Sequence, residues 1–397
     1  MSATSSDATS ITVNCPAGAI TGEPHVFRSI PYAQAQPFHN AEKLDPLKID
    51  ARGKHEGLYL SLSTPQARFG ADFPVVVFIH GGGYDSGTRF DQRNDPTLFR
   101  AEGVVMVSVD YRVGVEGFAH FHDDEKNRYR GIDDCGLALE WVQKNIEYFG
   151  GDPTNVTLIG QSAGAGIALW LTRLDHYKGA FRRVVALSPS FPRQHFSARK
   201  GALRTALGTP ITRQKLAKLS PAKINKGYRR FARRYFTDLP LGPTPYNPNE
   251  LADIDLIISS TRDEMYNHQI GQWFDQRRRG ATLAARLLGV VNRDSYLKAA
   301  RKIDDRVVGR IIGDAMIRRF VAQTEKGWWI EFPGKHCEDL SLIFCEDSEA
   351  HRRISAFVHG KQPSWPPYSE DHRAALSLVD GTGKVVLDPL KMVRLAF

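Results

Sequence analysis

The sequence lacks long apolar runs, since no segment approaches the roughly 18 consecutive apolar residues of a membrane-spanning helix. Cysteine is scarce, with four residues in 397 and no C-x-x-C pair, which argues against a zinc site or a disulfide framework. Residues 1–10 are small and polar and have no apolar core of a secretory signal, so we expect a disordered tail there. These absences predict a protein of the reducing cytoplasm without a membrane span.

Acidic residues are absent from residues 176–237, which hold sixteen Lys or Arg in a chain whose net charge is +9. The positive excess therefore belongs to this one segment. If its cations line a site entrance, they would attract anionic esters; the alternative is a solvated helical face. The cations concerned are Arg193, Arg199, Lys200, Arg229, Arg230, Arg233 and Arg234. Nucleic-acid binding is not expected, because the interleaved aromatic residues recur at helical spacing, as core contacts do.

Apolar residues make up 42% of the chain and charged residues 24%, which is enough apolar material for a sizeable core. Short runs rich in Val and Ile, bounded by Gly, Pro or Asp, predict strands buried on both faces. They lie at residues 58–62, 74–80, 104–111, 156–160, 183–187 and 254–259. Helical patterns fall between them. The alternation predicts an α/β fold with a mostly parallel central sheet flanked by helices.

The helical patterns differ along the chain. The clearest covers residues 134–149, with Asp133 or Asp134 placed to cap it, and another covers 163–174. Two later stretches, at about 191–249 and 268–330, contain helical patterns at 228–236, 271–299 and 305–320. We predict that both stretches are insertions that form a reduced helical cap, so that residues 11–397 form a single domain.

The pentapeptide Gly160-Gln161-Ser162-Ala163-Gly164 has the form G-x-S-x-G. It follows the predicted strand at 156–160 and precedes a helical pattern, which is the context that a nucleophile elbow requires. The serine of such an elbow sits in a strained turn and needs small residues two positions away on either side. We therefore predict that Ser162 is a catalytic nucleophile; the alternative is a plain glycine turn.

Three consecutive glycines occur in His80-Gly81-Gly82-Gly83-Tyr84, at the end of the predicted strand at 74–80. Glycine lets the backbone approach a substrate and turn its N–H groups toward a developing oxyanion. We predict that the N–H groups of Gly82, Gly83 and Ala163 form an oxyanion hole. His80 is predicted to hold this loop in place, and the alternative for the run is a flexible loop.

These motifs belong to an ordered set that resembles the type-B carboxylesterase family, the cholinesterase-like α/β-hydrolases. The other matching stretches include Asp110-Tyr111-Arg112-Val113-Gly114, Phe149-Gly150-Gly151-Asp152-Pro153 and Gly334-Lys335-His336-Cys337-Glu338-Asp339-Leu340. The set runs in family order along nearly the whole chain. The resemblance implies an α/β-hydrolase fold and a serine carboxylester hydrolase that takes small-molecule esters through an acyl-enzyme, with no metal and no cofactor.

The resemblance also implies a catalytic acid. The family's triad runs in the order Ser, acid, His, with the acid just beyond a strand. Glu264, which follows the predicted strand at 254–259, takes that role, and Asp263 is the second candidate. Its carboxylate would orient the imidazole and stabilise the imidazolium. Family members usually have glycine where Met265 stands, which leaves the local geometry open.

The thirteen histidines include one in the motif that the family places before a late helix. The resemblance assigns His336 as the base, with His351 and His359 as alternatives. His336 would accept the proton of Ser162 and later give it to the leaving alcohol. Cys337 beside it is predicted to be a packing residue.

Three departures from the family narrow this prediction. Gly57 stands where extracellular members have a cysteine, which favours an intracellular form. Gln161 replaces the Glu of cholinesterases, and no aromatic choline-binding loop is found between Ser61 and Pro74, so a quaternary-ammonium substrate is not expected.

Amide hydrolysis and acyl transfer use the same machinery and stay open. The alternative function is a non-catalytic or anion-binding relative that uses its basic cap.

Overall fold

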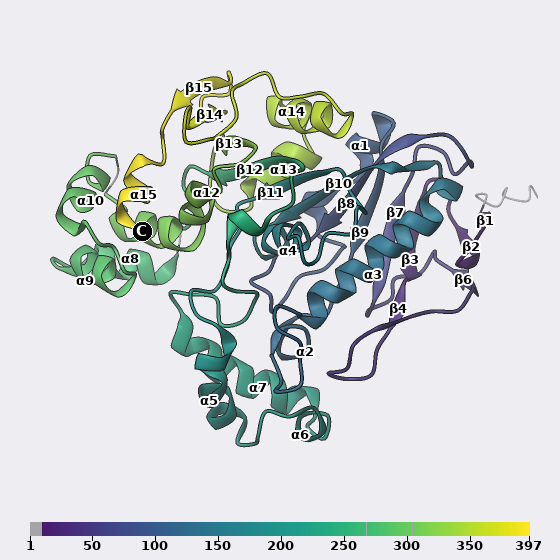
Figure 1. Ribbon diagram of the computed structural model, residues 1–397, viewed down its shortest axis with the longest axis horizontal. Coiled ribbons are helices and arrows are strands. Elements are labelled where there is room, and N and C mark those ends of the chain that lie inside the picture. The colour runs from purple at the N-terminus through teal and green to yellow at the C-terminus, as the bar shows by residue number, and fades with distance from the viewer. Residues whose placement is uncertain (1–9, 267, 304) are drawn as a thin grey trace, which may run out of the picture.

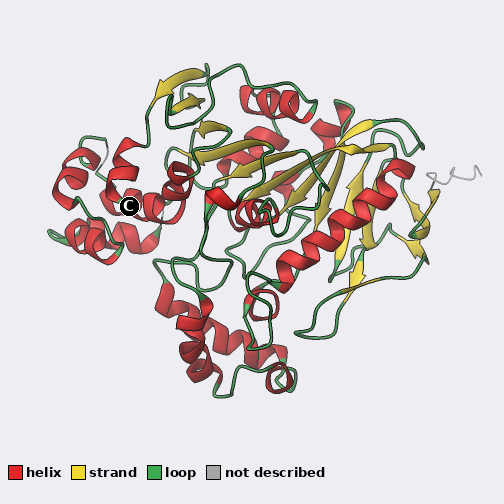
Figure 2. Cartoon of the chain, viewed as in Figure 1, coloured by secondary structure: helices red, strands yellow, loops and turns green. Residues whose placement is uncertain are grey.

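The computed structural model describes residues 10–397 except Asn267 and Asp304, so the tail predicted at residues 1–10 falls almost wholly outside it. One ten-stranded sheet runs through the molecule, with helices on both faces (Figures 1 and 2). In spatial order its strands are β15 (Lys384–Leu387), β14 (Ala374–Ser377), β13 (Trp328–Phe332), β12 (Asp255–Thr261), β11 (Arg183–Leu187), β10 (Gly151–Gln161), β8 (Phe73–Ile79), β9 (Val105–Val109), β7 (Tyr59–Ser63) and β3 (Val26–Pro31).

Seven neighbouring strands, from β9 to β14, pair in parallel, whereas β3, β7 and β15 pair antiparallel at the edges. The six strands predicted from apolar runs are all present, as β7 to β12. The mostly parallel sheet is therefore confirmed.

Alternate residues of the central strand β8 point to opposite faces of the sheet. Val75, Val77 and Ile79 pack with helices α3 (Arg130–Asn145) and α4 (Ala163–Leu171). Val76 and Phe78 pack with α1 (Thr97–Ala101), α13 (Glu338–Phe344) and α14 (Glu349–Val358). Both faces are covered, which explains why the strand sequences are apolar at successive positions.

The remaining helices lie further from the sheet. Between β11 and β12, α5 (Phe196–Leu207), α6 (Arg213–Leu216) and α7 (Pro221–Ala232) form a lobe at the bottom of Figure 1. Between β12 and β13 lie α8 (Gln269–Asp275), α9 (Gly280–Leu287), α10 (Arg293–Ala300), α11 (Val307–Gly313) and α12 (Arg319–Gln323). The range 268–330, predicted as an insertion, thus ends inside β13. In the described part of the chain, no helix combines the length and the apolar character needed to cross a membrane.

Shorter elements complete the chain. A small sheet joins β1 (Ile11–Cys15), β2 (Gly18–Gly22) and β6 (Leu47–Asp50), and β4 (Ala33–Gln34) pairs with β5 (Glu42–Lys43). Helix α2 (Gly114–Phe118) precedes α3, and α15 (Lys391–Ala396) ends the chain.

The predicted cap of α3 is wrong. The helix begins at Arg130 with Tyr129 before it, so Asp133 and Asp134 lie within its first turns. Asp134 is fully buried and accepts hydrogen bonds from the Arg112 guanidinium at 2.6 and 2.8 Å. The Asp134–Arg112 ion pair therefore joins α3 to the connection between β9 and α2.

The chain reverses direction across the sheet beside β8. It passes from β8 to its neighbour β9 and then crosses to β10 on the other side of β8. Ligands of parallel α/β sheets bind at such a switch point, outside the carboxyl ends of the strands. Both glycine-rich motifs follow these strand ends, so the topology brings them to the same place.

Candidate active site

Ser162 occupies a sharp turn between β10 and α4. Its backbone angles are φ 55° and ψ −117°, a region that residues with side chains rarely adopt. A Cβ on Gly160 would collide with the carbonyl oxygen of Gly164, and one on Gly164 would collide with that of Ile79. The two glycines of G-x-S-x-G are therefore required by close backbone approach, and they hold a strained serine at the carboxyl edge of the sheet.

Three of the predicted side chains form one hydrogen-bonded chain. His336 Nε2 lies 3.0 Å from Ser162 Oγ, and His336 Nδ1 lies 2.6 Å from Glu264 Oε2. The loops that carry them are also joined, since the His336 N–H donates to the Glu264 carbonyl and the Asp263 N–H to the Gly334 carbonyl. The ends of β10, β12 and β13 thus bring a serine hydroxyl, an imidazole and a carboxylate together at hydrogen-bonding distance, the arrangement that nucleophilic catalysis requires.

The Glu264 carboxylate is buried, and both of its oxygens have hydrogen-bond partners. Its Oε1 accepts from Ser188 Oγ and from the Thr261 N–H, both at 2.7 Å. Arg318 donates to the Thr261 carbonyl at 2.9 Å and adds positive charge nearby. Burial would raise the pKa of Glu264, but His336, Arg318 and the Ser188 hydrogen bond outweigh it and lower that pKa. Glu264 is therefore held as a carboxylate facing the imidazole.

His336 responds to the same pairing in the opposite sense. Burial by itself disfavours an imidazolium, but the adjacent Glu264 carboxylate outweighs burial and raises the pKa of His336 well above its ordinary value. The contact at Nδ1 also directs Nε2 toward Ser162. The pair can therefore accept a proton from the serine and stabilise the charge that results.

The glycine loop after β8 lies against this serine. A Cβ on Gly81 would lie 3.2 Å from the Ser162 Cβ. Gly82 and Gly83 have φ of 111° and 62°, which only glycine adopts readily. Within the described residues, the N–H groups of Gly82, Gly83 and Ala163 have no hydrogen-bond acceptor. His80 supports the loop, since its ring stacks on Tyr111 and its Nδ1 lies 2.8 Å from the Gly81 carbonyl oxygen.

The other sequence candidates lie apart from the serine. The side chain of Asp263 does not reach His336, although its neighbour Glu264 does. His351 is buried with its Nδ1 2.6 Å from the Ile343 carbonyl oxygen, and His359 is exposed at the end of α14. Met265, at the family's glycine position, leaves the Glu264–His336 contact intact.

Three supporting residues were missed by sequence reasoning. Ser188 and Thr261 stand at the ends of β11 and β12, and this position at the carboxyl edge was the available signal. Asp339, three residues after His336, is fully buried, and within the described residues neither of its oxygens has a hydrogen-bond partner. Burial, and next the charge of Glu264, raise the pKa of Asp339 to about 7. Cys337 accepts a hydrogen bond from Gln161 at 3.1 Å.

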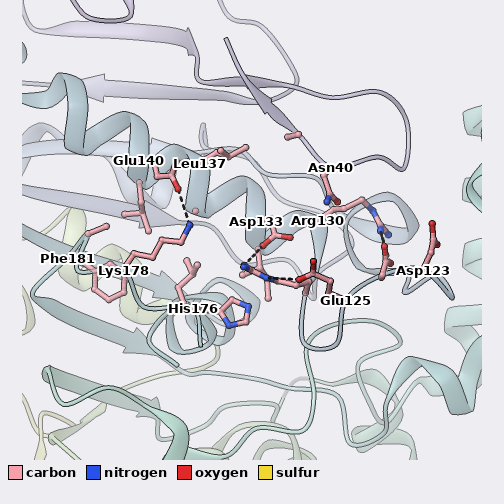
Figure 3. Close-up of a pocket in the computed structure, with 18 of the residues that line it drawn as sticks. Asn40, Asp123, Glu125, Arg130, Asp133, Leu137, Glu140, His176, Lys178 and Phe181 are labelled. Carbon is pink, nitrogen blue, oxygen red and sulfur yellow. Dashed lines mark hydrogen bonds and ion pairs between the residues drawn. The ribbon is translucent and has the colours of Figure 1, made fainter. Parts of the chain in front are cut away.

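The cavity in Figure 3 belongs to a different part of the molecule. It has a volume of about 380 Å³ and lies beside α3. Its charged side chains pair with neighbours, for example Arg128 with Asp133 at 3.0 Å and Lys178 with Glu140 at 3.2 Å. No residue of the Ser162 site lines it. Among the described residues, no three His, Cys, Asp or Glu side chains converge as metal ligands.

Known proteins place this chain in a family. Residues 7–207, just over half of the chain, match the Carboxylesterase family. The probable N-octanoylanthranilate hydrolase AqdA2 of Rhodococcus erythropolis is 26% identical over 459 aligned residues, covering 94% of this chain and 98% of that protein. The cocaine esterase of Oryctolagus cuniculus is 45% identical over 108 residues, which cover 27% of this chain and 20% of that protein.

Solved structures show the same fold. The carboxylesterase EST55 of Geobacillus stearothermophilus has a TM-score of 0.80 and 22% identity, covering 96% of this chain and 99% of that chain. The juvenile hormone esterase of Manduca sexta has a TM-score of 0.78 and 19% identity, covering 98% and 99%. The chain therefore belongs to the Carboxylesterase family, as a type-B carboxylic ester hydrolase with the α/β-hydrolase fold.

Proposed function

We propose that the protein hydrolyses carboxylic esters through an acyl-enzyme on Ser162. The observation that carries this proposal is the hydrogen-bonded chain Ser162–His336–Glu264, with its contacts of 3.0 and 2.6 Å. His336 takes the proton of Ser162 as the oxygen attacks the ester carbonyl, and gives it to the departing alcohol. His336 then deprotonates a water molecule, which attacks the acyl-serine and releases the acid. Glu264 keeps the imidazole oriented and stabilises its charged form.

The N–H groups of Gly82, Gly83 and Ala163 are the proposed oxyanion donors. Their lack of other acceptors and the contact of the loop with Ser162 support this role. Preorganised donors of this kind stabilise the tetrahedral intermediate, and loss of one typically costs about 10²–10³ in rate. The two stretches at 191–249 and 268–330 are proposed to form the cap of a single domain, which shapes the pocket for a small-molecule ester.

Amide hydrolysis is the second candidate. It is favoured by the match along almost the whole chain to a protein named as a hydrolase of N-octanoylanthranilate, an amide. The same three residues serve both reactions, because His336 can protonate a leaving nitrogen as it does an alcohol oxygen. Comparing N-octanoylanthranilate with octanoate esters in one assay separates the two candidates.

The test is hydrolysis of p-nitrophenyl esters from acetate to decanoate by wild type and Ser162→Ala. Loss of a triad serine costs on the order of 10⁶ in kcat, so the variant is expected to fall to background. Ser197→Ala, an exposed serine on α5, is the matched control and is expected to keep wild-type rates. An organophosphonate should label Ser162 in wild type. Substantial turnover by folded Ser162→Ala would refute the mechanism.

A further inference from the structure

The segment after β11 meets α12 in a cluster of aromatic rings. Phe191 stacks on Tyr246 with ring centroids 4.4 Å apart, and it meets Phe320 edge-on at 5.1 Å. Arg193 follows Phe191 by two residues, and Arg319 directly precedes Phe320. Two cations therefore border the same apolar surface.

The arginines near this cluster outnumber the carboxylates that could neutralise them. Asp238 binds the guanidinium of Arg199, which is only 1% exposed, and it also accepts from the Arg193 N–H at 3.1 Å. Its Oδ2 lies 3.5 Å from Arg193 Nε. Asp238 is thus already shared by Arg193 and Arg199, and it does not pair with Arg319.

Arg319 has no anion in the described part of the chain. Its guanidinium lies over the Phe320 ring at 4.4 Å, and its Nε is buried without a hydrogen-bond partner. Burial, and next the repulsion of Arg193, lower its pKa to about 10, an effect that Asp238 offsets only in part. Such a desolvated cation is costly unless an anion accompanies it.

A cavity of about 550 Å³ adjoins Arg319. Its other charged side chains are already paired, since Arg394 contacts Asp388 at 2.6 Å and Glu325 contacts Arg373 at 3.1 Å. Tyr246, Ala322, Val393 and Phe397 supply apolar lining. The cavity therefore offers one unpaired cation and an apolar wall, which fit a carboxylate on an apolar body.

The arginine pair lies close to the glycine loop of the active site. A Cβ on Gly242 would lie 2.7 Å from the Tyr84 ring and 3.0 Å from Pro192, the residue before Arg193. Leu239, next to Asp238, lies 3.7 Å from where a Cβ of Gly83 would be. The segment 239–242 thus approaches both the glycine loop and the residue before Arg193, whereas no residue of the Ser162 site lines the cavity beside Arg319.

We propose that Arg319, supported by Arg193, binds the carboxylate of an anionic ligand whose apolar body occupies this cavity. The favoured source of the carboxylate is a separate small carboxylic acid, because no residue of the Ser162 site lines the cavity. A substrate carboxylate shares the chemistry, and the experiment distinguishes the two sources.

Calorimetric titration of the full-length Ser162→Ala protein with benzoate and with neutral benzamide tests the site without turnover. Benzoate is expected to bind at least about tenfold more tightly than benzamide. Arg319→Gln should abolish this preference, Arg319→Lys should keep most of it, and Arg234→Gln, an exposed arginine of the same charge, should leave it unchanged. Equal binding of the two compounds, or a preference that survives Arg319→Gln, would overturn the proposal.

The source of the carboxylate is tested by kcat/KM for 4-nitrophenyl hydrogen glutarate relative to neutral 4-nitrophenyl pentanoate. If the substrate supplies the carboxylate, this ratio falls about tenfold or more in Arg319→Gln and recovers in Arg319→Lys. If a separate acid supplies it, the ratio is unchanged in Arg319→Gln although that variant has lost its preference for benzoate, and a tenfold fall in the ratio overturns this assignment in favour of the substrate. Benzoate binding in a wild type that hydrolyses neither ester would refute the proposed function and leave the carboxylate site standing.

Discussion

The Glu264–His336 contact sets how the proposed catalysis responds to pH. His336 must be neutral to take the proton of Ser162, and the Glu264 carboxylate raises the pKa of His336. Activity is therefore expected to fall as the pH drops through a histidine pKa above 6.5. Glu264→Gln removes the carboxylate, so the acid limb of kcat/KM should move to lower pH while the plateau falls by about 10⁴. Asp263→Asn is the control, and an acid limb that moves equally in that variant would contradict the assignment.

Asp339 is expected to make the stability of the folded protein depend on pH. Its pKa is about 7 in the folded protein against an ordinary 3.8, so between these values the folded state holds a proton that the unfolded state releases. The free energy of unfolding must then decrease as the pH rises through this window. Asp339→Asn removes the decrease, so the variant should gain up to about 4 kcal/mol relative to wild type between pH 4 and pH 8. Urea denaturation at several pH values measures this, and parallel pH curves would contradict it.

At the residue scale, local backbone geometry could be predicted where neighbouring residues in the sequence determine it. The strand, the glycines and the helix around Ser162 are consecutive in the sequence, so its turn could be predicted. Ser188 donates to Glu264 across the fold, and Asp339 is buried near the charge of Glu264, so no local pattern in the sequence marks either residue.

Two glycines in helices α3 and α4 provide a matched test of the elbow. Gly164 lies where a methyl group would collide with the Ile79 and His80 carbonyl oxygens, whereas a methyl group on Gly136 meets nothing within 4 Å. Gly164→Ala should cost about 1–3 kcal/mol and at least about 10² in kcat/KM, because the elbow is pushed from the glycine loop. Gly136→Ala should instead stabilise by roughly 0.5–1 kcal/mol, since alanine favours a helix. Similar effects of the two changes on thermal unfolding and activity would contradict this account.

The elements predicted best are those buried on both faces. Strands β8, β9 and β11 show near-continuous apolar runs because helices cover both sides of the sheet, whereas β7 alternates apolar residues with serine. Edge strands such as β15, whose residues are largely exposed, lack that signal and were missed. The capping prediction for Asp134 failed because the helix begins four residues earlier, at Arg130, and the buried carboxylate is instead paired with Arg112.

At the scale of the whole molecule, the basic segment has two sides. Arg193 and Arg199 turn inward to Asp238, which follows the segment directly in the sequence. Four others, Arg229, Arg230, Arg233 and Arg234, are exposed on α7 and the turn after it. The sequence shows the charge excess but does not separate buried cations from exposed ones, because that separation depends on how the segment folds.

The exposed cations should influence how charged substrates arrive. Steering by a positive surface is screened at a Debye length of about 8 Å in physiological salt. Raising NaCl from about 10 to about 150 mM is expected to lower kcat/KM severalfold more for 4-nitrophenyl hydrogen glutarate than for the pentanoate. Replacing Arg229, Arg230, Arg233 and Arg234 with Gln should flatten the difference. Equal salt dependence of the two esters would show that the surface does not steer.

The three side chains of the proposed triad come from distant parts of the chain, and His336 follows Ser162 by 174 positions. They meet only when β10, β11, β12 and β13 have assembled in that order, so a molecule with a misassembled second half presents the serine without its base. Under the proposed mechanism, stoichiometric labelling by a serine-directed reagent therefore counts molecules that have assembled correctly. Titrated against total protein, it gives a refolding yield and a way to sort variants by maturation rather than by chemistry.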